Sequence, residues 1–289
     1  MIGTRKIVYP DTVVWNCLFD EATDPARLRA QLHEHGLDLA YSSHVLYELS
    51  RTFRGTRPSS QQRATELFLR FKSFVEQDFP YLRQNVSVLL DESEAADGNI
   101  SGVQPFGGTE YSLFRSRVER LSSGNFDSQT DFAVTYRNSQ VQELRSSIKQ
   151  GEYTKLTELA GMTLSKFIEA AGRTHSRNIL KAHLAGVREG ALGSDLTRLA
   201  KRILRTRSYR VSHAFVWTDL FLTWRKERNG ALRRDAADDC YHLVNASYCD
   251  IYGTCDEDQK AYAPTVLPHV KFAHYDRTKS VTEWLCSLS

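Results

Sequence analysis

Residues 234–256, RDAADDCYHLVNASYCDIYGTCD, decide the fold. Their first part belongs to a pattern of apolar residues that predicts a helix over residues 231–248. Residues 249–254 then form a short segment typical of a strand, and Asp256 follows it directly. An acid just beyond the carboxyl end of a strand is typical of α/β folds, in which these strand ends line one crevice.

The same alternation of strand and helix recurs at both ends of the chain. The patterns predict four short strands, at residues 6–9, 37–41, 249–254 and 270–274. Helices are predicted between and after them, at residues 13–19, 24–36, 44–53, 256–262 and 278–288. Strands that alternate with helices in this way predict a parallel sheet with crossover helices.

The middle of the chain has a different pattern. Helical periodicity predominates, with helices predicted at residues 61–77, 109–121, 130–149, 164–179, 196–207 and 213–225. Residues 86–90 resemble an isolated strand, and residues 92–108 a loop. We therefore expect an α/β core formed by residues 1–58 and 229–289, interrupted by a large, mostly helical insertion at residues 59–228.

Composition restricts the class of protein. The 289 residues are 41% hydrophobic and 25% charged, as in an ordinary globular protein. No apolar run approaches the roughly 18 residues of a membrane span, and the first residues lack the features of a signal peptide, so a cytoplasmic location without membrane contact is expected. Five cysteines without a CxxC pair argue against a disulfide framework or a zinc ribbon.

Charge is unevenly distributed along the chain. Residues 173–234 hold 15 Lys or Arg against four Asp or Glu, whereas residues 235–261 hold seven acids and one Lys. A basic surface attracts a polyanion, while an acidic one repels it unless cations are bound there. This asymmetry is what an enzyme acting on phosphodiesters needs.

Four acids occupy positions at the predicted crevice: Asp11, Glu48, Asp239 and Asp256. Asp235 lies one helical turn before Asp239 and shares its face. Acids gathered in one place repel each other, so their natural partner is a hard divalent cation, Mg²⁺ or Mn²⁺. Taken singly, each acid also fits a helix cap, a helix dipole or a surface ion pair.

These segments resemble the PIN-like nuclease superfamily. Residues 7–12 are similar to the family's first strand and acid, and residues 42–49 to its second-acid helix. In residues 234–256, an Asp-x-x-His step precedes a Tyr-Cys-Asp strand and a Thr-x-Asp turn, as in many members. The resemblance covers about the first 55 and last 60 residues, and Val13 departs from it where many members carry a small polar residue.

The resemblance implies a Rossmann-like three-layer core and a metal-dependent endoribonuclease. Asp11, Glu48, Asp239 and Asp256 would bind Mg²⁺ or Mn²⁺ as the catalytic acids, with Asp235 as an auxiliary ligand. The ions would activate water to hydrolyse RNA and leave a 5′-phosphate. Three further residues would support the site: Thr254, Asp250 and His242. For His242, packing and hydrogen bonding in the core is the alternative role.

Basic side chains supply candidate contacts to the nucleic acid. They are Lys201, Arg202, Arg205, Arg207 and Arg210 in the densest basic run, with Arg54 and Arg57 after the second-acid helix. At these positions they could follow a phosphate backbone, or form only a solvated helix face.

Other functions remain open at this stage. One is a structure-specific DNA nuclease that uses the same acids. Another is a nucleic-acid-binding or regulatory protein with a degenerate site, an interpretation favoured if the acids do not converge or if a basic side chain fills the metal position. A toxin is a third, although the long insertion argues against it. A homodimer formed through the insertion is also an expectation.

Overall fold

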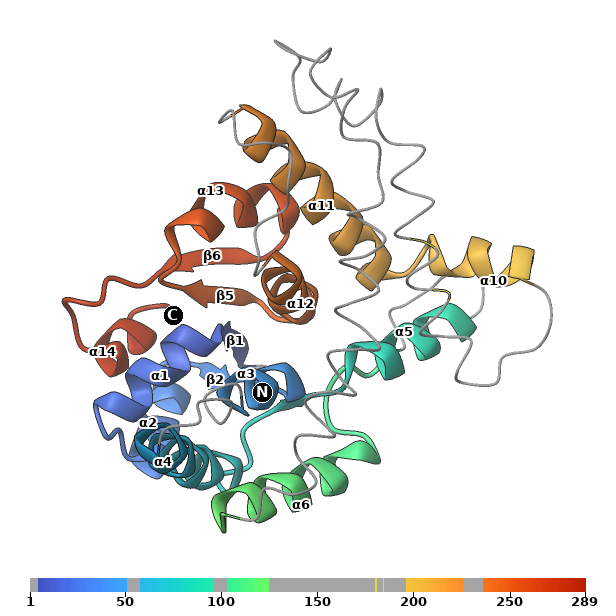
Figure 1. Cartoon of the computed structure of the whole chain (residues 1–289). Helices are drawn as coiled ribbons and strands as arrows, with labels where there is room; N and C mark the ends of the chain where they lie inside the picture. The colour runs from blue at the N-terminus through green and yellow to red at the C-terminus, as the bar shows by residue number, and fades with distance from the viewer. Residues whose placement is uncertain are drawn as a thin grey trace.

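The computed structural model describes residues 5–50, 58–95, 103–124, 180, 184, 196–225 and 236–289 (Figure 1). Several predictions lie outside these residues: the helices at 130–149 and 164–179, and the side chains of Asp235, Arg54 and Arg57. No helix among the described residues is long and apolar enough to cross a membrane.

The sheet has four parallel strands in the order β2-β1-β5-β6. These strands are β1 (Lys6–Pro10), β2 (Leu37–Leu39), β5 (Ile251–Thr254) and β6 (Lys271–His274). The predicted parallel α/β sheet is therefore confirmed. Because β1 and β5 are neighbours at the centre of the sheet, their carboxyl ends lie side by side at one edge.

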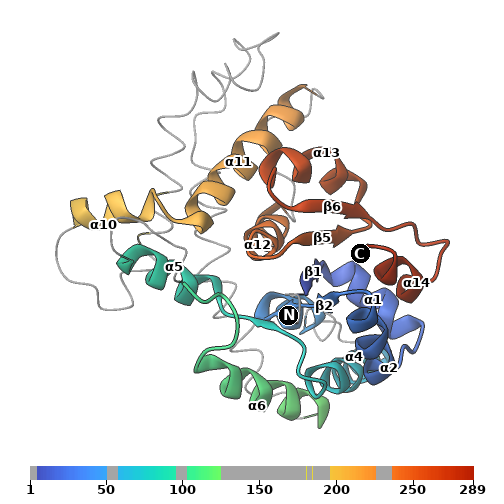
Figure 2. The same cartoon turned by 180° about the vertical axis from the view of Figure 1, so that it is seen from behind.

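Helices cover both faces of the sheet (Figures 1 and 2). Four of them pack on one face: α1 (Thr12–Asp20), α2 (Pro25–Glu34), α4 (Pro58–Val75) and α14 (Val281–Cys286). Three pack on the other: α11 (Arg207–Arg225), α12 (Ala236–Ala246) and α13 (Glu257–Val266). Side chains of β1 and β5 alternate between the two cores, with Val8 and Ile251 in the first and Tyr9 and Tyr252 in the second.

The remaining elements extend the molecule from this core. They are α3 (Ser43–Ser50), α5 (Asn85–Glu94), α6 (Glu110–Ser122), α10 (Leu196–Ile203), and the short parallel pair β3 (Tyr41–Ser42) and β4 (Tyr81–Leu82). The predicted helices near residues 61–77 and 109–121 are confirmed by α4 and α6.

Two local predictions in the middle of the chain were wrong. Residues 86–90 belong to helix α5, since a short apolar run fits a helix as well as a strand, and α5 buries Val88 and Leu89 beneath α10 and α11. The helix predicted over 196–207 ends at Ile203. Buried Thr206 then accepts a hydrogen bond from the Tyr209 backbone N–H at 3.2 Å, as an N-cap does, and α11 begins.

An aromatic cluster fixes α1 and α4 beneath the sheet. Trp15 is fully buried, and its ring meets those of Phe71 and Phe74 edge-on at centroid distances of 5.7 and 5.2 Å. Rings in such geometry contribute beyond their buried area. Since Asp11 begins α1, this packing also sets the position of Asp11 at the sheet edge.

Trp15→Ala is expected to lower the free energy of unfolding by about 3–5 kcal/mol, because it leaves a large cavity among these rings. Leu113→Ala on α6 is the matched control, since that side chain is 52% exposed, and it is expected to change stability by at most about 0.5 kcal/mol. Urea unfolding followed by circular dichroism measures both. Equal stability of the two variants would contradict the proposed anchoring role.

Candidate functional site

Asp11 lies at the carboxyl edge of the sheet, where the sequence predicts a crevice. Its side chain is 3% exposed and caps helix α1, with Oδ1 accepting a hydrogen bond from the Val14 N–H at 2.9 Å. Its other oxygen, Oδ2, accepts from the hydroxyl of Thr254. The Asp11 N–H donates to the Gly253 carbonyl at 2.9 Å. Asp11 is thus a helix cap and, at the same time, a carboxylate fixed against the end of β5.

Thr254 connects Asp11 to Asp256. Its fully buried hydroxyl donates to Asp11 and accepts from the Asp256 N–H at 3.0 Å. The Asp256 side chain caps α13, because its Oδ1 accepts from the N–H groups of Asp258 at 2.7 Å and Gln259 at 3.2 Å. Thr254 therefore orients the carboxylate of Asp11, and one oxygen of Asp256 is committed to the helix terminus.

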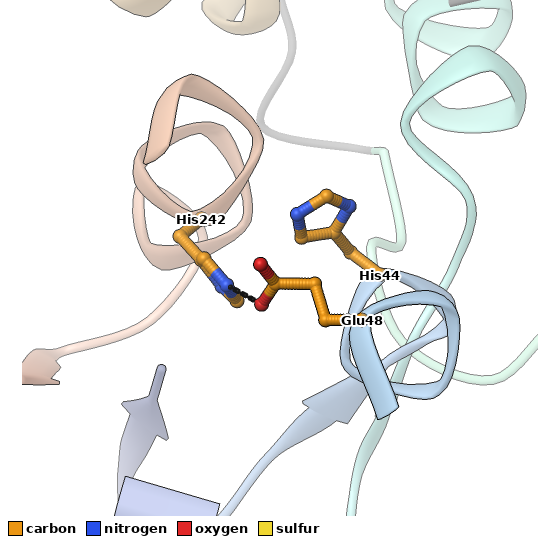
Figure 3. A group of neighbouring side chains, drawn as sticks. All are labelled: His44, Glu48 and His242. Atoms are coloured by element: carbon orange, nitrogen blue, oxygen red, sulfur yellow. Dashed lines mark hydrogen bonds and ion pairs between the residues drawn. The ribbon is translucent and has the colours of Figure 1, made fainter. Parts of the chain in front are cut away.

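Glu48 and His242 form a buried ion pair across the crevice, from α3 and α12. The Glu48 Oε2 lies 2.7 Å from the His242 Nε2 (Figure 3). His44, one turn before Glu48 on α3, is fully buried, and its ring lies edge-on to the His242 ring at a centroid distance of 4.7 Å. One ligand atom from each of the three residues lies within 4.8 Å of the others.

Asp239 is held by two side chains of α13. It is 8% exposed, and its Oδ1 accepts from the Gln259 Nε2 at 3.0 Å. Its Oδ2 accepts from the Tyr262 hydroxyl, also at 3.0 Å. Gln259 in turn accepts from the Tyr252 hydroxyl of β5. The carboxylate of Asp239 is therefore fixed in orientation relative to the sheet edge.

Three of the four predicted acids raise the pKa of His242, and one of them, Glu48, contacts it directly. Burial disfavours the charged imidazole, but the pKa of His242 is nevertheless raised, by Glu48 first and then by Asp11 and Asp239. Burial also opposes ionisation of Glu48, yet the charge and hydrogen bond of His242, with the charge of His44, hold the Glu48 pKa at about 2. Burial raises the pKa of Asp11, and the charge of His242 and the hydrogen bond from Thr254 offset this rise only in part.

A buried polar network orients the His242 ring. The Tyr9 hydroxyl lies 3.1 Å from His242 Nδ1 and 3.0 Å from the Ser42 Oγ. Asn245, one turn along α12 from His242, donates from its Nδ2 to the Tyr9 hydroxyl and to Ser42, both at 3.1 Å. Burial raises the pKa of Tyr9 far above its usual range, so its hydroxyl stays protonated. The network holds Nδ1 on the side away from Glu48.

The sequence prediction and the structure differ over the remaining site residues. Asp250 lies at the amino end of β5, opposite the crevice, where its Oδ2 accepts from the Ile7 N–H at 2.7 Å, so its role is structural. His44 was missed, although the spacing of His44 and Glu48 places both on one helix face. The orienting side chains were missed too, namely Tyr9, Asn245, Gln259 and Tyr262.

The basic run lies away from the crevice. Arg207 is half-buried, donates to the Ser247 carbonyl at 2.8 Å and stacks on the Tyr248 ring at 4.9 Å. This contact lies at the carboxyl end of α12, whereas Asp239 lies near its amino end. The other four cations of the run are exposed: Lys201, Arg202, Arg205 and Arg210. Arg207 therefore packs against the end of α12, and its phosphate contact stays a prediction.

Comparisons with models of known protein families, with curated proteins and with solved structures found no significant match. The PIN-like resemblance thus stays a prediction, and function has to be argued from the chemistry of the crevice.

The ion pair predicts a pH-dependent stability for the metal-free protein, kept in a chelator. Glu48→Gln leaves the buried His242 charge without its partner and is expected to cost about 3–5 kcal/mol where the pair is intact. The Glu48 pKa is lowered from 4.5 to about 2. The stability that ionised Glu48 contributes is therefore complete above pH 4.5 and is lost as the pH falls towards 2. The His242 pKa is raised from 6.5. The stability that protonated His242 contributes is therefore complete below pH 6.5 and is lost as the pH rises through the raised pKa.

Urea unfolding at a series of pH values measures the difference between wild type and Glu48→Gln, which is expected to be greatest between pH 4.5 and 6.5. Glu76→Gln is the control: Glu76 forms an exposed ion pair with Lys72, which typically contributes only about 0–1 kcal/mol. A difference for Glu48→Gln that does not vary with pH would contradict the buried ion pair.

Proposed function

We propose that this chain is a metal-dependent nuclease, an endoribonuclease with a PIN-like core. One observation carries the proposal. Asp11, Glu48 and Asp239 come from three distant segments of the chain, and all three act on the buried imidazole of His242 at the carboxyl edge of a parallel sheet. In α/β proteins this edge is where ligands bind.

Among the described residues, no three of Asp11, Glu48, Asp239 and Asp256 bring carboxylate oxygens within 4.8 Å of one another, so a cation shared by these acids would have to draw them together. Asp11 and Asp239 are buried, and each oxygen of the two carboxylates accepts one hydrogen bond from the protein. A carboxylate oxygen that accepts a hydrogen bond can still bind a metal ion. The groups that act most strongly on Asp11 include no Lys or Arg. Buried acids placed in this way favour a hard cation as the missing positive charge.

Asp11 and Asp239, with Glu48 and Asp256, would hold Mg²⁺ or Mn²⁺. Such an ion would supply Lewis-acid activation of water and neutralise negative charge on the phosphate. The chain itself would position the ligands. Thr254 fixes Asp11, and Gln259 with Tyr262 fixes Asp239, as supporting residues in metal sites do.

RNA as the substrate rests on the resemblance of residues 234–256 to PIN-like ribonucleases. DNA stays an alternative, because the same acids serve both phosphodiesters. The four exposed cations of the basic run would attract either polymer, and they would do so at a distance from the crevice.

One observation favours a second candidate function. The His242 imidazole already forms an ion pair with Glu48, and so compensates part of the acidic charge without a metal. A nucleic-acid-binding or regulatory protein with an inactive site would have the same feature. Cleavage assays separate the two functions.

Asp239→Asn is expected to reduce cleavage in the presence of Mn²⁺ by at least about 100-fold. Loss of a residue that only supports a metal ligand typically lowers activity by about 10–100-fold, and loss of the ligand itself should lower it further. The assay compares single-stranded RNA, a stem–loop RNA and DNA of the same sequence, with and without a chelator. Asp24→Asn is the control, since Asp24 caps α2 far along the chain and Asn caps equally well. Equal cleavage by Asp239→Asn and wild type, or cleavage that persists in the chelator, would sink the proposal.

The double variant Lys201→Gln/Arg202→Gln is expected to bind single-stranded RNA more weakly than wild type. Each lost phosphate contact should reduce the slope of log affinity against log salt by about 0.7. The matched control is Arg27→Gln/Lys279→Gln, which removes two exposed cations elsewhere on the molecule. Fluorescence anisotropy at several salt concentrations measures both variants. An unchanged slope in the first variant means that this part of α10 is a solvated helix face.

A further inference from the structure

Two imidazoles lie beside the carboxylates of the crevice, and the proposed Mg²⁺ or Mn²⁺ site does not use them. His44 and Glu48 share one face of α3, four residues apart, and both point towards His242 of α12 (Figure 3). Within the part of the chain that the structure describes, these three side chains are the one group of His, Cys, Asp or Glu whose ligand atoms converge to within 4.8 Å.

We propose that His44, Glu48 and His242 form a binding site for a first-row transition metal of the Zn²⁺ and Co²⁺ class. Two nitrogen ligands and one oxygen ligand suit these ions, whereas Mg²⁺ prefers oxygen ligands alone. The site is distinct from the acidic one, although the two share Glu48. It requires no nuclease activity, so it stands or falls independently of the proposed function.

The ligand atoms are close to the separation that such an ion requires. In a tetrahedral site with bonds of about 2.0–2.2 Å, ligand atoms lie roughly 3.4 Å apart. Glu48 Oε2 and His242 Nε2 are 2.7 Å apart, joined by a proton, and the widest separation in the group is below 4.8 Å. The ion would replace that proton, with His242 and Glu48 moving slightly apart and His44 moving closer.

The surroundings of His242 are those of a metal-binding histidine. Metal-binding imidazoles usually engage their second nitrogen in a hydrogen bond that fixes the ring and its tautomer. Here Nδ1 lies 3.1 Å from the Tyr9 hydroxyl, and Asn245 donates to that hydroxyl at 3.1 Å. The Tyr9 hydroxyl therefore engages Nδ1, and Nε2 is the ring nitrogen that faces Glu48.

The backbone also places His44. Its N–H donates to the Ser42 Oγ at 3.2 Å, so the start of α3 is joined to the network that holds Tyr9. The centroid of the His44 ring lies 5.6 Å from that of Tyr47 and 5.4 Å from that of Tyr241. Glu48 is the most exposed of the three ligands, with 16% of its side chain accessible against 4% for His242, so an ion would enter from the side of Glu48. Three protein ligands leave a position for water or substrate, as in catalytic zinc sites.

Titration of the untagged, metal-stripped protein with Co²⁺ in excess Mg²⁺ tests this inference. We expect one Co²⁺ per chain, with visible absorption typical of nitrogen coordination, and displacement by Zn²⁺. His44→Gln and His242→Gln should each weaken binding by at least about 100-fold, and Tyr9→Phe by about 10–100-fold as a positioning residue. His33→Gln is the control. His33 pairs with Asp38 at 3.5 Å, and among the described residues no third ligand atom joins them.

The inference is overturned if wild type binds no Co²⁺ in this assay, if His44→Gln and His33→Gln bind it equally, or if Mg²⁺ displaces it. Should the glutamine variants fail to fold, the wild-type protein provides the test by itself. The electron spin-echo spectrum of bound Cu²⁺ is then expected to show coupling to two imidazole nitrogens, and its absence overturns the inference. Asp11→Asn separates the two proposals, because it should impair cleavage and leave Co²⁺ binding intact.

Discussion

The buried imidazole of His242 is the group on which the crevice depends. Asp11 at the start of α1, Glu48 of α3 and Asp239 of α12 all act on its charge. Without a positive charge near them, the repulsion between these carboxylates and the cost of burying them would oppose packing of the helices. A charged His242 relieves part of that cost, and a metal ion would relieve more. The positive charge of protonated His242 therefore stabilises the folded protein, and the proposed metal would add to this.

The sheet supplies the precision of this arrangement. Because β1 and β5 are adjacent and parallel, Asp11 and Thr254 reach the same edge and bond to each other. Residues of β1 face both cores, so Val8 anchors the strand on one side while Tyr9 carries the network that orients His242. Shifting the β1–β5 register by one residue would move Tyr9 away from His242 and separate Asp11 from Thr254.

Much of this architecture can be predicted from the residues. The strands and their parallel pairing follow from the alternation of short apolar segments with helices, and the proximity of Asp11 to the end of β5 follows from the common edge of parallel strands. Contacts made only in the folded chain could not be predicted. Arg207 looks like any basic residue until Ser247 and Tyr248 are seen beside it. Asp250 fits a motif, but it lies at the wrong end of β5. His44 carries a weak signal, because a His and a Glu four residues apart occur on many helices.

The two proposals share Glu48, which would serve both the carboxylate site and the site formed with His44 and His242. The most direct test of the central claim is a crystal structure of the protein soaked in Mn²⁺, with anomalous diffraction used to locate the ion. The account predicts an anomalous peak within about 2.2 Å of side-chain atoms from at least two of Asp11, Glu48, Asp239 and His242. A peak bound only elsewhere on the surface, or carboxylates of Asp11 and Glu48 too far apart to share the crevice, would contradict it.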